Sequence, residues 1–392
     1  MKKIVIISKE PVDRNLKGGA LRYANFADRL AGEFEVCLIA PGEGRVAANG
    51  VRIVDASAAN IKKELAKADV CIYNGAWFFR LYPLLAAFRG KLIIDILPSL
   101  FEDKLYLPRW AWLRQKLKFN RLFRLGDHYM VLNRAGHEYF SAKVFPRKAT
   151  VVPYGVPAGF KKTKSVLRGI DPRIGKDDKV ILFSGRLLKW YDPATLVAAF
   201  RQVLKKLPSA RLVFLGAGKD AALIKMTEDI KDKVVVLDWV DNREVGDHLL
   251  EADIAVLTQF NTEESKYCLR IRALDFIAAG LPMAISEGGT VAEMIKEKGG
   301  GSVVPPEDPR ALAEAILKLL TDDTFRRECK EKLALLAEEL SWEKVIRPLA
   351  DMCRESVGTQ VRPSLADIAA YYMLATPLEA AYAAYKTIRR PA

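Results

Sequence analysis

The sequence predicts an α/β protein with two domains, each built around a parallel β-sheet. The chain has 392 residues, which is long enough for two domains with complete hydrophobic cores. Short apolar runs alternate with helical patterns along the whole chain, and this alternation is typical of parallel α/β sheets. Residues 156–173 are rich in proline, glycine and basic side chains and have no clean period, so we predict that they link the two domains.

The predicted strands fall into two groups, one on either side of this linker. In the first group the apolar runs are residues 4–8, 36–40, 51–55, 70–74, 92–96, 128–132 and 151–154. In the second group they are residues 180–185, 212–216, 234–239, 254–257, 282–286 and 302–304. We therefore expect two Rossmann-like domains, at residues 1–160 and 175–345, with a ligand in a cleft between the carboxyl edges of their sheets.

The C-terminal segment, residues 346–392, is predicted to be helical in large part. Residues 361–390 are rich in alanine and tyrosine and are interrupted by Pro363 and Pro377. These helices could cross back onto the first domain, or they could contact a membrane, where tyrosine and basic side chains suit the interface. Packing is the favoured interpretation, because alanine-rich faces pack closely and the run carries little charge.

The composition is that of a soluble globular protein, with 50% apolar and 28% charged residues. The five cysteines are scattered, and no pair has the spacing of a metal or redox site. This usage favours a reducing compartment over disulfides or a zinc site. The apolar run at the start is too short for a signal peptide, and no run reaches the roughly 18 apolar residues that span a bilayer. We expect a cytoplasmic protein.

The net charge of +14 indicates an anionic partner, such as nucleic acid, anionic lipid or a phosphorylated ligand. Nucleic acid is not expected, because the chain has no zinc finger, RNA-binding aromatic motif or basic low-complexity tail. Residues 104–124 contain seven basic and no acidic residues, interleaved with aromatic side chains. This composition favours contact with an anionic membrane surface, although part of the run must form the inner face of a domain helix.

The most informative stretch is residues 265–282. It follows the apolar run 254–257 and keeps helical spacing up to a stop at Gly280 and Pro282. A second turn, residues 286–290, opens another helix. Both helix starts are expected at the carboxyl edge of a parallel sheet, where bare N–H groups bind anions, most often phosphates.

Three cations, Lys266, Arg270 and Arg272, crowd the first of these helix starts. Cations at this end oppose the helix dipole, so an anion bound between them would resolve the conflict. Alternatively, the side chains are solvated or pair with Glu263 and Glu264. For any single cation we favour this alternative, whereas for the whole arrangement we favour an anion site.

Other candidate residues follow predicted strands. Gly18 and Gly19 let the backbone approach a ligand closely, although taken alone they are better explained as a tight turn. Arg186 and Lys189 could hold phosphate oxygens rather than only cover a surface loop. Asp95 could orient a sugar hydroxyl or an incoming acceptor, or equally well cap the next helix. No acidic pair or histidine cluster suggests a bound metal, and no histidine has the partner of a hydrolytic triad.

Taken together, these motifs resemble the GT-B glycosyltransferases, and specifically the retaining family-4 group, over nearly the whole chain. The matching segments are Gly18-Gly19, 152–156, Gly185-Arg186-Leu187, 252–257, 274–282 and Ser341-Trp342-Glu343. The resemblance implies metal-independent transfer of a sugar from a nucleotide-sugar to a glycan or lipid-linked acceptor, with retained configuration and without a cofactor. It also implies a role in cell-surface polysaccharide or glycolipid assembly, with the protein peripheral on the inner face of the membrane.

The resemblance further implies roles for single residues. Arg186 and Lys189, together with the two helix starts, would stabilise the charge that develops on the leaving diphosphate, with Asp95 as a third catalytic candidate. The leaving phosphate would take the proton of the acceptor, so no protein nucleophile is required. Asp275 would bind the ribose, and the Gly18-Gly19 turn would close over the diphosphate when the domains clamp together. The implied donor-binding residues are Gly18, Gly19, Glu264, Arg270, Arg272, Asp275, Gly288, Gly289 and Thr290.

The chain departs from the family at two places. At two positions, eight apart, where the family usually has glutamates, the chain has Tyr267 and Asp275. Tyr267 cannot replace a sugar-binding carboxylate, so either Glu263 or Glu264 shifts into its place or the contact is lost. The loop lysine, Lys189, lies closer to Arg186 than usual and is followed by Trp-Tyr-Asp-Pro. The lost glutamate leaves open an alternative function, a non-catalytic GT-B protein that binds nucleotide-sugar or scaffolds an assembly complex.

Overall fold

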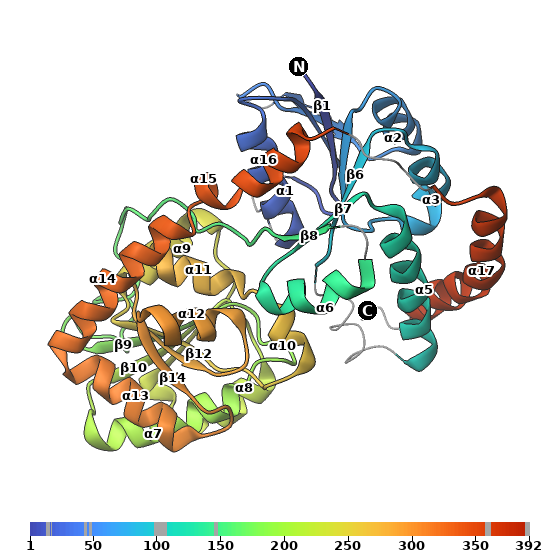
Figure 1. The fold of residues 1–392 in the computed structure, drawn as a ribbon. Helices are drawn as coiled ribbons and strands as arrows, with labels where there is room; N and C mark the ends of the chain where they lie inside the picture. The colour runs from blue at the N-terminus through green and yellow to red at the C-terminus, as the bar shows by residue number, and fades with distance from the viewer. Residues whose placement is uncertain are drawn as a thin grey trace. The chain divides into compact units, whose positions relative to one another are not determined.

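The computed structural model describes residues 1–12, 16, 18–42, 45–46, 49–97, 108–144, 148–356 and 362–388. The chain forms two compact units (Figure 1). The first unit consists of Met1–Pro153 together with Ile346–Ala392, and the second is Tyr154–Val345. Each unit contains one parallel or largely parallel sheet with helices packed against it, which confirms the predicted α/β class with two Rossmann-like domains.

The first unit has an eight-stranded sheet with the order β3-β4-β2-β1-β5-β6-β7-β8, in which only the β3–β4 pair is antiparallel. Its strands are β1 (Lys3–Ile7), β2 (Glu35–Ala40), β3 (Arg45–Val46), β4 (Arg52–Asp55), β5 (Val70–Tyr73), β6 (Lys91–Asp95), β7 (His128–Val131) and β8 (Lys148–Val151). Its helices are α1 (Gly18–Leu30), α2 (Ala58–Leu65), α3 (Phe78–Ala87), α5 (Arg109–Leu125), α6 (Arg134–Val144), α16 (Arg347–Arg354) and α17 (Leu365–Ile388).

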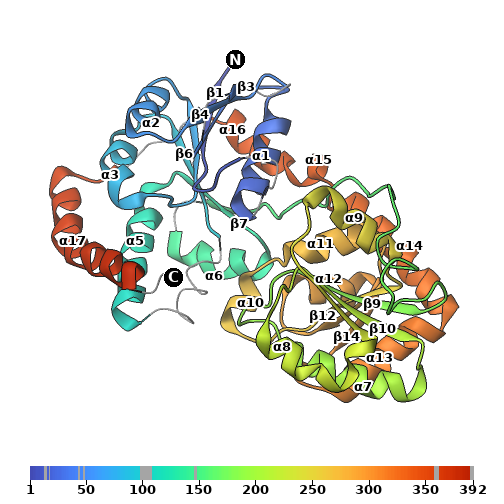
Figure 2. The same ribbon diagram turned by 180° about the vertical axis from the view of Figure 1, so that it is seen from behind.

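The second unit has a six-stranded parallel sheet with the order β11-β10-β9-β12-β13-β14 (Figure 2). Its strands are β9 (Lys179–Ser184), β10 (Ala210–Leu215), β11 (Val234–Leu237), β12 (Ile254–Leu257), β13 (Met283–Ser286) and β14 (Gly301–Val304). Its helices are α7 (Pro193–Lys206), α8 (Ala221–Met226), α9 (Asn242–Glu251), α10 (Glu263–Tyr267), α11 (Ile271–Ala278), α12 (Thr290–Lys298), α13 (Pro309–Thr321), α14 (Asp323–Glu339) and α15 (Trp342–Val345), with a 3₁₀ helix at Glu228–Lys233.

The apolar runs form strands because both faces of each sheet are covered by helices. All five residues of β1 are buried, as are all four residues of β12. Aspartates cap helices that lie between strands: Asp192 caps α7, and Asp220 caps α8. Each apolar run predicted from the sequence overlaps a strand, although the run 151–154 shares only Val151 with β8, and the short edge strand β3 is the only addition among the described residues.

The predicted linker is fixed to the second unit rather than forming a tether. Phe160 packs so closely on α9 that a Cβ atom at Gly246 would lie 2.6 Å from its ring. Asp247 accepts hydrogen bonds of 2.6 Å from both the N–H and the hydroxyl of Thr163. One turn later on α9, the Glu251 carboxylate accepts the backbone N–H groups of three successive residues, Val166, Leu167 and Arg168. Two acidic side chains on one face of α9 therefore hold this segment through its backbone N–H groups.

Replacement of Glu251 by glutamine is expected to destabilise the second unit by about 1.5–3 kcal/mol, because three N–H groups lose a charged acceptor. Burial alone would raise the pKa of Glu251, but its ion pair with Lys162 and these N–H groups outweigh burial and lower the pKa to about 2. The stabilisation is therefore complete above the unfolded-state value of 4.5 and is lost as the pH falls toward 2. Urea unfolding of the wild type and the variant at pH 7 and pH 3 measures the difference, and a pH-independent difference would contradict this account.

The helix α16 packs on the first unit through its C-terminal carbonyl groups. The ammonium group of Lys2 donates to the carbonyl oxygens of Cys353, Arg354 and Glu355 at 2.7–3.2 Å. That of Lys91 donates to the Met352 carbonyl at 2.8 Å. Two lysines thus satisfy the unpaired carbonyls and the negative end of the helix dipole.

The helix α17 packs against α3 and α5 of the same unit. Tyr371 lies in an aromatic cluster, with ring centroids 5.6 Å from Phe78 and 5.1 Å from Tyr82. Arg114 of α5 forms an ion pair of 2.7 Å with Glu379 of α17. The C-terminal helices thus pack back on the first domain, as the alanine-rich sequence predicted. In the part of the chain that the structure describes, every helix is either too short or too polar to cross a bilayer.

Candidate functional site

Most of the predicted site residues meet at one edge of the second unit. The strands β9, β12 and β13 are parallel neighbours, so their carboxyl ends lie side by side. The loops that follow these strands carry Gly185 and Arg186, Thr258 and Gln259, and Gly288 and Gly289. The helices α11 and α12 start at the same edge, and neither start has a side-chain cap. Such an edge is where parallel sheets bind ligands.

The predicted helix in residues 265–282 is broken in two. The short helix α10 begins at a capping box formed by Thr262 and Ser265, and the chain leaves helical geometry at Cys268. A new helix, α11, starts only after Arg270. The helix start that could face an anion is therefore at Ile271 rather than near Ser265.

Arg270 is paired inside the protein. Its guanidinium donates to both oxygens of the Glu264 carboxylate, at 3.0 and 2.8 Å, and to the side-chain oxygen of Gln259 at 2.8 Å. Arg270 is 6% exposed and Glu264 is 2% exposed. The two predicted donor-binding side chains neutralise each other, which is the alternative that the sequence favoured for a single cation. This geometry gives them a structural role, because it holds α10 against the start of α11, and does not support direct contact with a ligand.

The Trp190–Asp192 segment locks the Arg186 loop in place. The guanidinium of Arg270 lies 5.3 Å from the ring centroid of Trp190, within cation–π range. Asp192 is buried; it caps α7 by accepting the N–H of Thr195 at 3.0 Å, and its carbonyl accepts the Thr258 hydroxyl at 2.7 Å. The unusual Trp-Tyr-Asp-Pro sequence thus joins the end of β9 to the end of β12.

Arg272 lies beneath the turn at Gly185. Its guanidinium donates to the carbonyl of Ser184 and lies 4.5 Å from the ring centroid of Tyr191. Gly185 has a φ of +104°, and a Cβ atom there would lie 2.2 Å from the Arg272 guanidinium, so only glycine fits. Burial lowers the pKa of Arg272. Arg272 therefore supports the Gly185 turn from below.

Asp275 is the second buried ionisable group on α11, one turn after Arg272. Part of its surface is exposed. Burial raises its pKa to about 7, although the charge of Arg272 acts in the opposite direction. A carboxyl group with such a pKa can act as hydrogen-bond donor or acceptor near neutral pH, which suits hydroxyl groups of a ligand.

The glycine turn before α12 is held by Gln259. The side-chain amide of Gln259 donates to the Gly288 carbonyl at 3.2 Å, and a Cβ atom at Gly289 would lie 2.8 Å from the same amide nitrogen. Thr290 is buried, and its hydroxyl donates to the carbonyl of Cys268 at 3.3 Å. Gln259 therefore links both helix starts, because it also binds Arg270. Its only signal in the sequence is its position after β12.

Arg186 and Lys189 have exposed side chains on the loop after β9. Arg186 forms no hydrogen bond or ion pair with any residue that the structure describes. Among the predicted cations of the site, it contrasts with Arg270 and Arg272, which are engaged within the protein. Its guanidinium is therefore available to a ligand.

The remaining predicted residues lie in the first unit. Gly18 and Gly19 start α1, and the carboxylate of Glu10 accepts the N–H of Ala20 at 3.0 Å. A Cβ atom at Gly18 would lie 3.5 Å from the same carboxylate. Glu10, which the sequence did not single out, thus supplies the negative charge at this helix start. A ligand anion here would have to displace it.

Asp95 is fully buried and is held by Arg22 and Tyr23. Arg22 donates to both carboxylate oxygens at 2.8 and 3.1 Å, and the Tyr23 hydroxyl donates at 2.9 Å. Arg22 also donates to the carbonyls of Val152 and Pro153, at 2.7 and 2.8 Å. The side chains of Asp95 and Arg22 have no exposed surface. This buried ion pair favours a structural role for Asp95 over the predicted catalytic one.

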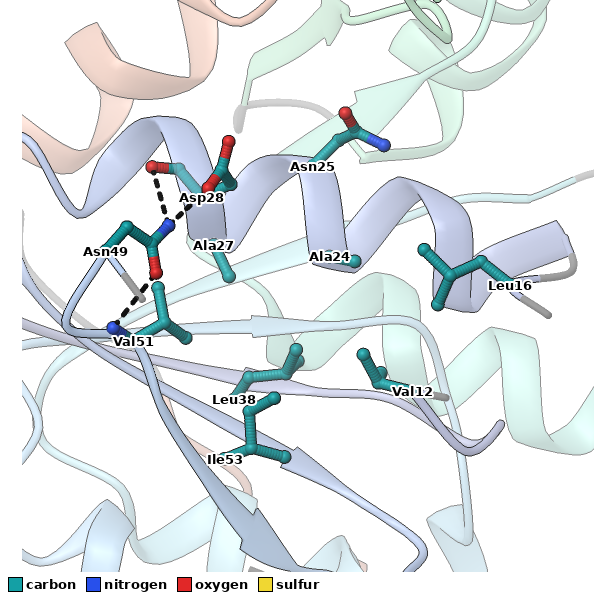
Figure 3. A pocket seen from close by; sticks show the side chains of 10 residues that line it. All are labelled: Val12, Leu16, Ala24, Asn25, Ala27, Asp28, Leu38, Asn49, Val51 and Ile53. Carbon is teal, nitrogen blue, oxygen red and sulfur yellow. Dashed lines mark hydrogen bonds between the residues drawn. The ribbon is translucent and has the colours of Figure 1, made fainter. Parts of the chain in front are cut away.

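A cavity of about 430 Å³ lies in the first unit between α1 and the strands β2 and β4 (Figure 3). Its described lining is Val12, Leu16, Ala24, Asn25, Ala27, Asp28, Leu38, Asn49, Val51 and Ile53. The charged side chain of this lining is Asp28, which is hydrogen-bonded to Asn49. A cavity with one carboxylate and apolar walls does not suit a phosphate, and it contains none of the predicted site residues.

Comparison with known proteins gives a family match within the second unit. Residues 178–322 match the family described as glycosyl transferases group 1. Over 44% of its length the chain is 28% identical to an uncharacterized glycosyltransferase of Methanocaldococcus jannaschii, covering 43% of that protein. Over 57% of its length it is 26% identical to a D-inositol 3-phosphate glycosyltransferase of Kineococcus radiotolerans, covering 55% of it. The chain thus spans about half the length of these curated relatives.

Solved structures are similar over most of the chain. Sucrose-phosphate synthase from Thermosynechococcus elongatus has a TM-score of 0.68 at 14% identity, covering 90% of this chain and 98% of that one. Anabaena HepE, in complex with UDP and glucose, has a TM-score of 0.66 at 14% identity, covering 90% and 99%. At this identity the likeness shows the fold, which is GT-B. Together with the family match, it supports the interpretation of the chain as a group 1 glycosyltransferase with the GT-B fold.

Proposed function

We propose that the chain is a retaining glycosyltransferase that moves a sugar from a nucleotide-sugar to a glycan or lipid-linked acceptor. The observation that carries the proposal is the exposed guanidinium of Arg186 beside two helix starts without side-chain caps, at the carboxyl edge of β9, β12 and β13. All of these residues lie within the segment that matches the glycosyltransferase family. The HepE structures with UDP and with UDP-glucose support a nucleotide-sugar as the donor.

The chemical demand of the reaction is the charge that grows on the leaving diphosphate. The Arg186 guanidinium can hold two phosphate oxygens at once, and Lys189 adds a mobile positive charge. The N–H groups at the starts of α11 and α12 point toward the same edge and need no metal to stabilise an anion. In the proposed retaining reaction the leaving phosphate accepts the acceptor's proton, so the protein supplies positive charge and orientation rather than a nucleophile.

The donor is proposed to bind at the carboxyl edge of the second unit. Asp275 would hold the ribose hydroxyls, and the acceptor would be bound by the first unit. No cofactor is required beyond the nucleotide-sugar itself. Assembly of a cell-surface polysaccharide or glycolipid is the proposed pathway, with the protein in the cytoplasm and peripheral to the membrane through residues 104–124, of which 104–107 lie outside the described part.

Replacement of Asp275 by asparagine tests the ribose contact, because at pH 8 it should raise the stability of the fold and lower the affinity for nucleotide. Because burial raises the folded-state pKa from 3.8 to about 7, the favourable contribution of Asp275 to stability is complete below pH 3.8 and is lost as the pH rises through 7. The variant should therefore be more stable than the wild type at pH 8, by up to about 4 kcal/mol, and equally stable near pH 3.5. Nucleotide affinity at pH 8 should fall, since the ribose loses a charged acceptor.

Thermal unfolding across this pH range and calorimetric titration with nucleoside diphosphates measure both effects. A variant that is more stable but binds nucleotide as tightly as the wild type would remove Asp275 from the ribose site. Loss of stability at every pH would contradict the buried-charge explanation itself.

A second candidate function is a non-catalytic nucleotide-sugar-binding or scaffold protein of the same fold. Tyr267 stands where the resemblance expects a sugar-binding glutamate, and the nearby Glu264 is neutralised by Arg270. If the purified protein transfers the sugar to an acceptor, or slowly hydrolyses a nucleotide-sugar, it is an enzyme. Nucleotide-sugar binding without either reaction decides for the binding protein.

A further inference from the structure

The helix α17 presents an uncharged face to solvent along its whole length. From Ile368 to Tyr385 its only charged residue is Glu379, and this carboxylate turns inward to Arg114. At 1.5 Å per residue this stretch is about 27 Å long. The outer face comprises Ala369, Met373, Leu374, Thr376, Ala380 and Ala384, all of them exposed. Met373 is 73% exposed and Leu374 57%. A solvent-facing helix normally carries charged side chains on such a face, so this one indicates a partner.

The tyrosines of α17 do not belong to this face. Tyr371 is buried, and Tyr372 donates its hydroxyl to the carbonyl of Phe79. Tyr382 lies 4.3 Å from the guanidinium of Arg114, and Tyr385 packs against Trp110 with ring centroids 5.7 Å apart. The aromatic side chains that the sequence suggested for a membrane interface therefore fix α17 to α3 and α5. The opposite, aliphatic side of the helix is the one left open.

The neighbouring helix α5 adds unneutralised positive charge. It has no acidic residue, and its inward cations are used by α17: Arg114 pairs with Glu379, and Arg121 lies 3.9 Å from Asp367. Arg109, Lys116 and Arg124 are exposed and form no ion pair with any residue in the described ranges. The exposed apolar residue of the same helix is Leu113, at 44%. An aliphatic helix face beside a row of cations has the chemistry of a surface for anionic lipid.

We propose that the outer face of α17, together with the exposed cations of α5, binds the surface of an anionic membrane. Met373 and Leu374 would enter the boundary between headgroups and acyl chains, and the three cations would pair with lipid phosphates. A second copy of the chain fits less well, since a two-fold contact through α17 would bring the α5 cations of both copies together in a protein of net charge +14. The inference deepens the proposed function by naming the surface that would bring the transferase to a lipid-linked acceptor.

Vesicle flotation of the full chain tests the proposal, without any nucleotide-sugar present. The protein should float with phosphatidylglycerol-containing vesicles at low salt, less at high salt, and little with pure phosphatidylcholine. The double variant Met373→Asp, Leu374→Asp should lose at least about tenfold in vesicle affinity, because it adds two negative charges to the inserted face. Leu335→Asp is the matched control, since Leu335 is 63% exposed on α14 of the second unit, and it should float like the wild type.

A second set of variants tests the contribution of the α5 cations to vesicle binding. Lys116→Glu with Arg124→Glu should abolish the salt-sensitive part of binding, whereas Arg327→Glu on α14 should not. Ala380→Asp, on the same face of α17, repeats the test if the double aspartate variant does not fold. Flotation of the Asp variants at wild-type level, absence of flotation at low salt, or a dimer that dissociates on Met373→Asp would each overturn the proposal. Nucleotide binding is measured on the same samples. A variant that loses vesicle binding but still binds nucleotide has lost the membrane surface and not the donor site.

Discussion

Replacement of Arg186 by alanine is expected to lower kcat/KM for sugar transfer by roughly 100- to 1,000-fold, or about 2.7–4 kcal/mol of transition-state stabilisation. The side chain is exposed on the loop after β9 and has no hydrogen-bond or ion-pair partner among the described residues, so its loss leaves the fold unchanged. Its charge would matter most when the diphosphate leaves, so kcat should fall together with kcat/KM. Initial rates with the nucleotide-sugar that binds best measure the effect.

The matched control is Arg327→Ala, which removes an exposed arginine of the same unit outside the family match. It should leave both kinetic constants at wild-type values. The melting temperatures of both variants should equal that of the wild type. Unchanged turnover in the Arg186 variant would remove this residue from the site, and an equal loss in the Arg327 variant would show that the effect reflects net charge rather than a specific contact.

Replacement of Asp95 by alanine is expected to destabilise the first unit by about 3–5 kcal/mol. The reason is that the guanidinium of Arg22 would remain fully buried with its carboxylate partner removed. The carbonyls of Val152 and Pro153 still accept two of its hydrogen bonds, which favours the lower part of this range. Hydrogen exchange of the β1 and β6 segments reports on the first unit alone, because a chain of two units need not unfold in one step.

Two further variants separate the structural role of Asp95 from a catalytic one. Removing both charges, with Arg22→Met and Asp95→Leu, should cost less than Asp95→Ala alone, because no unpaired charge stays buried. Asp95→Asn keeps an acceptor for Tyr23 and should retain transfer activity in the folded protein. Wild-type stability of Asp95→Ala, or loss of activity in a fully folded Asp95→Asn protein, would contradict the structural assignment.

The fold could be predicted from the sequence because its strands are buried on both faces. Residues 4–7 and 254–257 are apolar without interruption, and helical patterns between such runs leave few alternatives to parallel sheets. The contacts of the linker could not be predicted. Asp247 and Glu251 bind backbone N–H groups of residues 156–173, and those two acidic residues are distant in sequence.

The site could be predicted in outline but not in its contacts. The turns at Gly185 and Gly288 were visible because they follow strands directly, and the cations around α11 were visible because they crowd an expected helix start. The sequence could not show which cation is available to a ligand. The answer depends on the ion pair between Glu264 of α10 and Arg270, which precedes α11. The contact of Glu10 with the start of α1 had no signal in a single sequence, because Glu10 lies ten residues before Ala20, whose N–H it accepts.

The central claim is that the carboxyl edge of the second unit binds the diphosphate of a nucleotide-sugar. A thermal-shift screen of UDP, GDP, ADP and CMP selects the nucleotide, and a crystal structure of that complex is the most direct test. We expect the diphosphate within hydrogen-bond distance of Arg186 and of the first N–H groups of α11 and α12, with Asp275 at the ribose. A nucleotide bound elsewhere, or an Arg186 guanidinium turned away from the diphosphate, would contradict this account.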